Sequence, residues 1–310
     1  MDSHSDVSVI IPTYNRPQWL SQAIESALAQ TLQPLEIIVV NDGGNKDQTR
    51  YIIDKYPQVK YVWQENRGPG AARNLGLKLS RGSYIQFLDD DDWLSADALI
   101  KKYSLLIKQP ELDIIYSDFY LVDESGKITR LFFESFCKPL PTGDLFSKLL
   151  HKNFIQLDTV LWKRITIEKA GGFSNTYGHE DWECLLKTAE FAHFGYIDEP
   201  LSYYRQHSNS LSNDFSGMYE GKISFQEKII ESRRFLLLPE KEQSFLLSKY
   251  AFQQWSYGDP ALARHFLNQS KIRDNHNILP ILLSGLMSLN RSFSRRLLHL
   301  YQSFFSFIRK

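Results

Sequence analysis

The feature that most constrains the fold is an alternation, over residues 7–88, between short β-branched segments and segments whose apolar residues recur at helical spacing. Nearly continuous apolar strands separated by helical connections indicate an α/β fold with a parallel sheet covered on both faces. The predicted strands are residues 7–11, 36–40, 59–63 and 83–88, and the predicted helices are residues 17–30, 47–53 (with Asp47 as the cap) and 68–79.

Polar segments follow each of these strands. Ligands of parallel sheets bind beyond the carboxyl ends of the strands. We therefore expect one crevice to be lined by Pro12–Asn15, Asn41–Gly44, Asn66–Gly70 and Asp89–Asp92.

The pattern becomes mixed after Gln109 and purely helical from about Ser216. This change predicts an α/β domain over residues 6–215 and a C-terminal α-helical extension over residues 216–310. The later strands are expected at 113–120, 128–133 (after a hairpin turn) and 160–162, and the later helices at 180–190, 223–238, 241–257, 261–270 and 282–308.

Composition excludes several classes of protein. Lys+Arg and Asp+Glu are 36 each, so the formal net charge is zero and there is no overall field for a nucleic-acid partner. The two cysteines, Cys137 and Cys184, exclude a disulfide scaffold. Residues 1–6 do not resemble a secretory signal, and Ile278–Leu289 is shorter than the roughly 20 residues of a spanning helix. We expect a cytoplasmic protein.

The run Asp89–Asp92 follows an apolar strand directly. Adjacent carboxylates raise one another's pKa, so a compensating charge is expected. A divalent cation takes oxygen ligands, and magnesium is often shared between carboxylates and substrate phosphates. A solvated acidic loop is the alternative.

A series of ordered motifs resembles the family 2 glycosyltransferases. The motifs are Val9–Asn15, Val39–Gly43, Asn66–Asn74, Phe87–Asp92, Gly171–Phe173, His179–Trp182 and Tyr204–His207. The resemblance implies a GT-A fold, a mainly parallel nucleotide-sugar-binding sheet flanked by helices, with a nucleotide-binding half (6–112) and an acceptor half (113–215). It also implies a nucleotide diphosphate sugar donor, with a UDP-sugar favoured, Mn²⁺ or Mg²⁺, and inverting transfer.

The resemblance assigns donor contacts to Pro12, Thr13, Tyr14, Asp42, Asn66, Arg73, Asp89 and Asp90. Asp42 would accept the imide proton of uracil, and Arg73 would lie near the diphosphate. From the residues alone, an Asx turn at Asp42 and a surface role for Arg73 remain open. Asp90 occupies the variable position of the family's Asp-any-Asp motif.

Metal and catalytic roles are implied in the same way. Asp91 matches the family's metal ligand, and His207 matches a histidine that can complete the metal shell. Asp181 matches the base that takes the acceptor's proton, and Glu180 is the second candidate. An acid-rich first helical turn is the alternative for both. Asp92 either supports the metal shell or caps a helix.

The function predicted from this resemblance is transfer of a single sugar to a glycan or lipid-linked acceptor in bacterial-type surface polysaccharide or glycoconjugate assembly. The two alternative functions are nucleotidyl transfer and inactive binding. A nucleotidyltransferase needs a basic, glycine-rich loop after its first strand, whereas Pro12–Pro17 has a single arginine and no glycine. An inactive binding module would lack Asp42, Asp89, Asp91 or Asp181, and all are present.

The C-terminal segment has basic and apolar residues but no acidic residue beyond Asp274. This composition predicts peripheral contact with the inner face of a membrane. A core or dimer helix is the alternative. The basic residues are Arg291, Arg295, Arg296, Arg309 and Lys310.

Overall fold

The computed structural model describes residues 5–135, 140–176, 178–208, 210, 215–276 and 279–287. The chain divides into two compact units. The first comprises Met1–Asn175 and Glu180–Ser210, and the second comprises Thr176–His179 and Leu211–Lys310. The predicted division at residues 215 and 216 stays a prediction.

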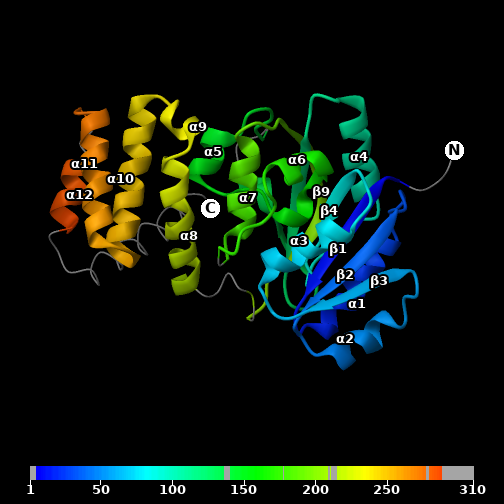
Figure 1. The fold of residues 1–310 in the computed structure, drawn as a ribbon. Helices are drawn as coiled ribbons and strands as arrows, with labels where there is room; N and C mark the ends of the chain where they lie inside the picture. The colour runs from blue at the N-terminus through cyan, green and yellow to red at the C-terminus, as the bar shows by residue number, and fades with distance from the viewer. Residues whose placement is uncertain are drawn as a thin grey trace. The chain divides into compact units, whose positions relative to one another are not determined.

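The first unit contains one sheet. Its strands are β1 (Val7–Thr13), β2 (Glu36–Asp42), β3 (Val59–Gln64), β4 (Tyr84–Phe87), β5 (Trp93–Leu94), β6 (Ile114–Val122), β7 (Ile128–Leu131), β8 (Leu161–Lys163) and β9 (Phe194–Arg205). Their order is β3-β2-β1-β4-β8-β6-β9-β5, with β7 paired to β6 (Figure 1). The predicted parallel pairing is confirmed for β1 to β4. The other half is mixed, because β8, β5 and β7 run antiparallel to their neighbours.

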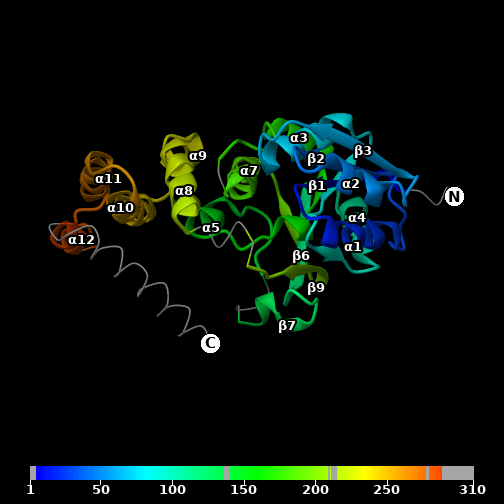
Figure 2. The same cartoon turned by 90° about the horizontal axis from the view of Figure 1, so that it is seen from below.

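Helices cover both faces of this sheet (Figure 2). The helices of the first unit are α1 (Pro17–Leu28), α2 (Lys46–Ile53), α3 (Pro69–Leu79), α4 (Ala98–Lys108), α5 (Phe146–His151), α6 (Arg164–Lys169) and α7 (Glu180–Ala189). Alternate residues of β2 point to opposite faces. Ile37 and Val39 join the core under α1, α2 and α4, whereas Ile38 and Val40 pack against Ala72 of α3.

Two local predictions for the first unit are wrong. The cap of α2 is Asn45, whose side chain accepts from Gln48 N at 3.0 Å, and Asp47 lies in the first turn. The strand predicted to reach Phe133 ends at Leu131, and a 3-10 helix (Phe132–Ser135) follows. The buried Asp118 carboxylate accepts the main-chain N–H of Phe133 at 3.1 Å, which takes this segment out of strand pairing.

The second unit is helical where it is described. Its helices are α8 (Phe215–Ile230), α9 (Arg233–Leu236), α10 (Glu240–Tyr257), α11 (Pro260–Arg273) and α12 (Leu279–Met287). The single helix predicted over residues 223–238 is wrong, because α8 ends at Ile230 and Ser232 caps the separate helix α9 by accepting from Phe235 N. The predicted helix beyond Met287, with its basic residues, lies outside the described residues. Among the described helices, none is long and apolar enough to span a membrane.

The contact between α3 and β1 depends on a glycine. A Cβ added at Gly76 would lie 2.3 Å from Cγ2 of Ile10, a fully buried side chain. Gly76→Ala should therefore lower the free energy of unfolding by about 1–3 kcal/mol, the usual effect of overpacking. Thermal unfolding followed by circular dichroism measures this change.

The matched control is Gly285→Ala in α12, where an added Cβ would meet no atom within 4 Å. Alanine is the better helix former, so this variant should be unchanged or more stable by up to about 1 kcal/mol. An unchanged melting temperature for Gly76→Ala would show that β1 and α3 are not held at this separation.

Candidate functional site

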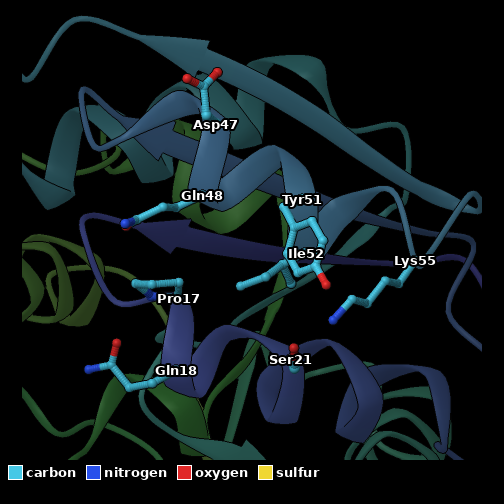
Figure 3. Close-up of a pocket in the computed structure, with 8 residues that line it drawn as sticks. All are labelled: Pro17, Gln18, Ser21, Asp47, Gln48, Tyr51, Ile52 and Lys55. Atoms are coloured by element: carbon cyan, nitrogen blue, oxygen red, sulfur yellow. The ribbon is translucent and has the colours of Figure 1, made fainter.

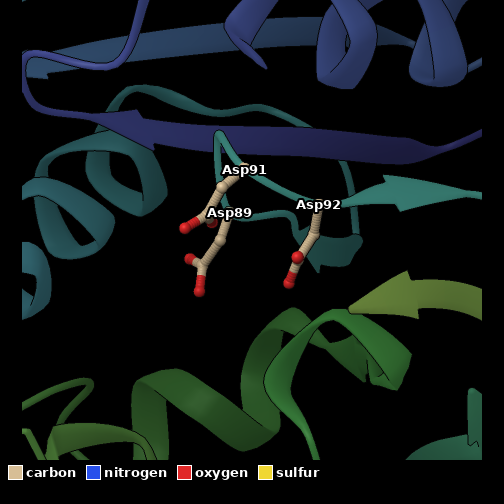
Figure 4. A group of neighbouring side chains, drawn as sticks. All are labelled: Asp89, Asp91 and Asp92. Atoms are coloured by element: carbon tan, nitrogen blue, oxygen red, sulfur yellow. The ribbon is translucent and has the colours of Figure 1, made fainter. Parts of the chain in front are cut away.

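The acidic loop, Asp89–Asp92, connects β4 to β5 at the carboxyl edge of the sheet. Carboxylate oxygens of Asp89, Asp91 and Asp92 all lie within 4.8 Å of one another. Figure 4 shows the three side chains on one side of the loop. Three of the four acidic residues therefore form one cluster beyond β4, while the predicted crevice lined by all four polar segments stays a prediction.

Asp90 turns into the protein and fixes the turn after β1. Its Oδ2 accepts from Thr13 Oγ1 at 2.6 Å and from Tyr14 N at 3.3 Å, and Oδ1 lies 3.2 Å from Arg16. Asp90 is only 3% exposed. Its observed role is thus to join the turn that contains Pro12, Thr13 and Tyr14 to the acidic loop, while a direct donor contact stays a prediction.

Asp91 and His207 meet although they are distant in sequence. His207 Nε2 lies 2.8 Å from Asp91 Oδ2, and the His207 ring lies 4.3 Å from the ring of Trp19. Arg16 donates to the same Asp91 oxygen at 2.6 Å. Carboxylate oxygens and an imidazole nitrogen form a donor set that suits Mn²⁺ or Mg²⁺, so these residues fit the metal that the sequence predicts.

Arg73 is buried between two acids. Its NH2 lies 2.6 Å from Asp89 Oδ1, and its NH1 lies 2.7 Å from Glu180 Oε1. Burial alone would lower the pKa of Arg73, but the two carboxylates raise it above its ordinary value. The alternative of a surface arginine is wrong, and this ion-pair bridge connects the acidic loop to the first turn of α7.

Asp181 follows Glu180 at the start of α7. Burial, followed by the charge of Glu180, raises the pKa of Asp181 to about 7. Asp181 Oδ1 accepts from Trp182 N at 2.7 Å, and the Nδ2 of Asn153 lies 3.5 Å from Oδ2. Trp182 is a core residue, 5% exposed, whose Nε1 donates to Leu149 O. A carboxyl group with this pKa can accept a proton near neutral pH.

Asp42 organises the loop that follows β3. Its Oδ1 accepts from Gln64 Nε2 at 2.6 Å and from Arg67 N at 2.9 Å, and its Oδ2 accepts from Gly68 N at 2.8 Å. A Cβ at Gly43 would lie 2.5 Å from Asn66 N, so a glycine is needed for this close approach. The roles of Asp42 and Asn66 toward a base stay predictions.

A buried polar network lies beneath the acidic loop. Burial raises the pKa of Asp92 well above its ordinary value and that of Asp158 to about 6. Gln86 Nε2 donates to the main-chain oxygen of Asp158 at 2.8 Å, and Gln86 Oε1 accepts from Lys102. Burial lowers the pKa of Lys102 to about 7.

Sequence reasoning missed the partners of the acidic residues. Arg16, Arg205 and Asp158 are charged residues that contact the acidic loop. Arg205 lies within the Tyr204–His207 motif, and Asp158 is an isolated acid in the apolar segment 154–162. A charged residue in an otherwise apolar segment is a signal for a buried contact.

A groove of about 620 Å³ lies apart from these residues, between α1 and α2 (Figure 3). It is lined by Pro17, Gln18, Ser21, Asp47, Gln48, Tyr51, Ile52 and Lys55. None of the predicted site residues lies among them.

Comparison with known proteins gives consistent results. Residues 8–157 match a family model described as glycosyl transferase family 2. An uncharacterized glycosyltransferase of Rickettsia typhi is 33% identical over 242 residues, which cover 72% of this chain and 74% of that protein. The chain spans only 22–33% of the length of other curated relatives, from Rickettsia bellii, Rickettsia conorii and Rickettsia felis.

Solved structures show the same fold. Residues 1–349 of Staphylococcus aureus TarS, in complex with UDP-GlcNAc, align with a TM-score of 0.62 at 20% identity, covering 85% of this chain and 79% of that 1–349 chain. The mannosyltransferase PcManGT of Pyrobaculum calidifontis, in complex with GDP-Man and Mn²⁺, aligns with a TM-score of 0.58 at 15% identity. The alignment covers 92% of this chain and 80% of the PcManGT chain.

The Arg73 bridge predicts a large stability effect. Arg73→Met leaves Glu180 buried without its cation, so it should lower the free energy of unfolding by about 3 kcal/mol. Adding Glu180→Gln to that variant should restore part of the loss, because the uncompensated charge is removed. Urea unfolding of both variants measures the difference.

The control is Arg81→Met, since the Arg81 side chain is 67% exposed and its partner Glu36 keeps bonds from Ser8, Lys60 and the main-chain N–H of residue 81. It should change stability by less than about 1 kcal/mol. A double variant less stable than Arg73→Met would contradict the assignment of Arg73 and Glu180 as a mutually dependent pair.

Proposed function

We propose that this chain, which belongs to glycosyl transferase family 2, transfers a single sugar from a nucleotide diphosphate sugar to an acceptor hydroxyl with inversion. The observation that carries the proposal is the Arg73 bridge, because it holds the acidic loop beside the helix turn that contains Asp181. The acidic loop, which would bind the metal and diphosphate, and Asp181, which would accept the proton, therefore lie close together.

The donor is proposed to be a UDP-sugar. Asp42 would accept the imide N–H of the base at the end of β2, with Asn66 beside it, and the turn Pro12–Tyr14 would flank the ring. The TarS complex with UDP-GlcNAc, which has the same fold, supports a uridine nucleotide.

Asp91 and His207, with Asp89, would hold Mn²⁺ or Mg²⁺. When bound, such an ion stabilises the charge that develops on the leaving diphosphate. Arg16 adds a positive charge next to Asp91 that favours phosphate oxygens in the same place. The presence of Mn²⁺ in the PcManGT complex supports this assignment.

Asp181 would act as the base. Its raised pKa lets the carboxylate accept the proton of the attacking hydroxyl near neutral pH, while Arg73 and Glu180 fix the first turn of α7. Glu180 is the second candidate for this role.

The acceptor is proposed to be a glycan or a lipid-linked sugar of bacterial-type surface polysaccharide or glycoconjugate assembly. Peripheral membrane contact through the residues beyond Met287, a cytoplasmic location and an oligomer also stay predictions.

The first functional test is a screen of nucleotide sugars for release of free nucleotide diphosphate. A UDP-sugar should be cleaved with Mn²⁺ or Mg²⁺, and EDTA should abolish the release. Asp91→Asn should lower kcat on the order of 10²–10³-fold, since the ion contributes several kcal/mol.

Release of pyrophosphate from a nucleoside triphosphate and a sugar phosphate would instead identify a nucleotidyltransferase. Binding of UDP without turnover of any donor would identify an inactive module. Full activity in EDTA would contradict the metal assignment alone.

The proposed role of Asp181 as the base predicts how the rate of transfer depends on pH. The rate should rise with pH through about 7, because only the Asp181 carboxylate accepts a proton. Asp181→Asn should cost about 10²–10⁴ in kcat with little change in donor KM, and should remove this rise. Glu180→Gln should shift this rise to lower pH, because the charge of Glu180 raises the pKa of Asp181. Asp89 also raises that pKa, and Arg73 lowers it. A donor KM that worsens as much as kcat in Asp181→Asn would assign Asp181 to donor binding.

A further inference from the structure

Asp92 belongs to the acidic cluster by distance, yet its oxygens are used inside the protein. Oδ1 accepts the main-chain N–H of Arg205 at 2.7 Å. Oδ2 is buried, and no nitrogen or hydroxyl donor among the described residues reaches it. Burial, followed by the nearby carboxyl group of Asp158, raises the pKa of Asp92. The side chain is 1% exposed. Asp92 is therefore closed off from solvent, although one of its carboxylate oxygens lies within 4.8 Å of oxygens of Asp89 and Asp91.

Asp158 contacts the other end of the acidic loop. It lies in a 3-10 helix (Leu157–Thr159) before β8, and its Oδ1 accepts the main-chain N–H of Asp89 at 2.7 Å. Its main-chain oxygen accepts from the side chain of Gln86, a residue of β4. Asp158 is thus bonded to the chain just before the acidic loop and to the loop's first residue.

The two carboxyl groups together join three segments. Asp158 holds the N–H of Asp89, Asp92 holds the N–H of Arg205, and His207 lies two residues beyond Arg205. The guanidinium of Arg205 adds a bond from Nε to the main-chain oxygen of Asp91 at 2.9 Å. Main-chain contacts of Asp92 and Asp158 therefore connect the loop that contains Asp91 to the segment that contains His207.

We propose that Asp92 and Asp158 are positioning residues that form a buried carboxyl pair and hold Asp91 and His207 at the spacing a divalent cation needs. The inference rests on the proposed function, because it assigns a task to residues behind the proposed metal ligands. Asp92 is accordingly not a ligand, despite its place in the acidic cluster. Residues behind metal ligands typically change metal affinity 10–100-fold when they are removed.

The experiment measures Mn²⁺ binding to the full chain in the presence of UDP, by electron paramagnetic resonance of free Mn²⁺. Asp158→Ala and Asp92→Ala should each weaken Mn²⁺ binding about 10–100-fold. Asp158→Asn and Asp92→Asn should stay within a few-fold of the parent chain. An amide oxygen can still accept the main-chain N–H, and its NH₂ can donate to the opposite carboxylate.

The matched control is Val160→Ala, a fully buried apolar residue two positions from Asp158. It should lower the melting temperature without weakening Mn²⁺ binding. Equal weakening by Val160→Ala would overturn the proposal, because general destabilisation would then explain the effect.

Two further results would overturn it. Unchanged Mn²⁺ binding in both alanine variants would show that the pair does not set the spacing. Loss in Asp92→Asn with none in Asp158→Asn would make Asp92 a ligand. If the alanine variants do not fold, the two asparagine variants serve as the test. Weakened Mn²⁺ binding in both of them would contradict the proposal. A parent chain that binds no Mn²⁺ with UDP would instead contradict the proposed function, and the inference with it.

Discussion

The guanidinium of Arg73 is the group on which the candidate site depends, because it supplies the charge that lets two acids from distant segments lie together. Glu180 is 107 residues from Arg73 in the sequence, and Asp89 belongs to the acidic loop. Burial opposes an isolated charge, so these three groups are stable in the interior only as a set. Their association places Asp181 next to the acidic loop at the edge of the sheet.

The four side chains of the acidic loop differ in their exposure to solvent. Asp89 and Asp91 keep side-chain exposures of 25% and 12%, while Asp90 and Asp92 are nearly fully buried. The loop is a turn, in which the N–H of Asp92 donates to the main-chain oxygen of Asp89 at 3.2 Å, and Asp90 is buried by its contacts with the residues at and just after the end of β1. Asp89 and Asp91, the two acids of the Asp-any-Asp spacing, thus keep the more exposed side chains of the loop. Asp90, the departure from the family pattern, is accounted for by Thr13, Tyr14 and Arg16.

The sequence predicted β1 to β4 and their helices because each strand is a continuous apolar run between clear turn signals. It did not predict the pairing of β8 or β5, since strands of three and two residues carry little pattern and their partners are far away in sequence. Asp91 and His207, two residues that the motif resemblance assigns to the metal, are in contact in the structure, and their metal role stays a prediction. Arg16, Arg205 and Asp158 were missed, because a single charged residue in a sequence does not reveal that it meets a buried carboxylate or main-chain group.

The close approach of so many acids also requires that the acidic loop be fixed at both ends. β4 precedes the loop, and β5 follows it at once, pairing Trp93 with Tyr203 of β9. Arg205, two residues farther along β9, lies over the ring of Trp93 at 4.8 Å and donates to Glu124 O in the turn between β6 and β7. A short loop closed by strands on both sides loses little conformational entropy when it binds a ligand. The small strand β5, which the sequence pattern did not reveal, therefore gives the proposed metal site its preorganisation.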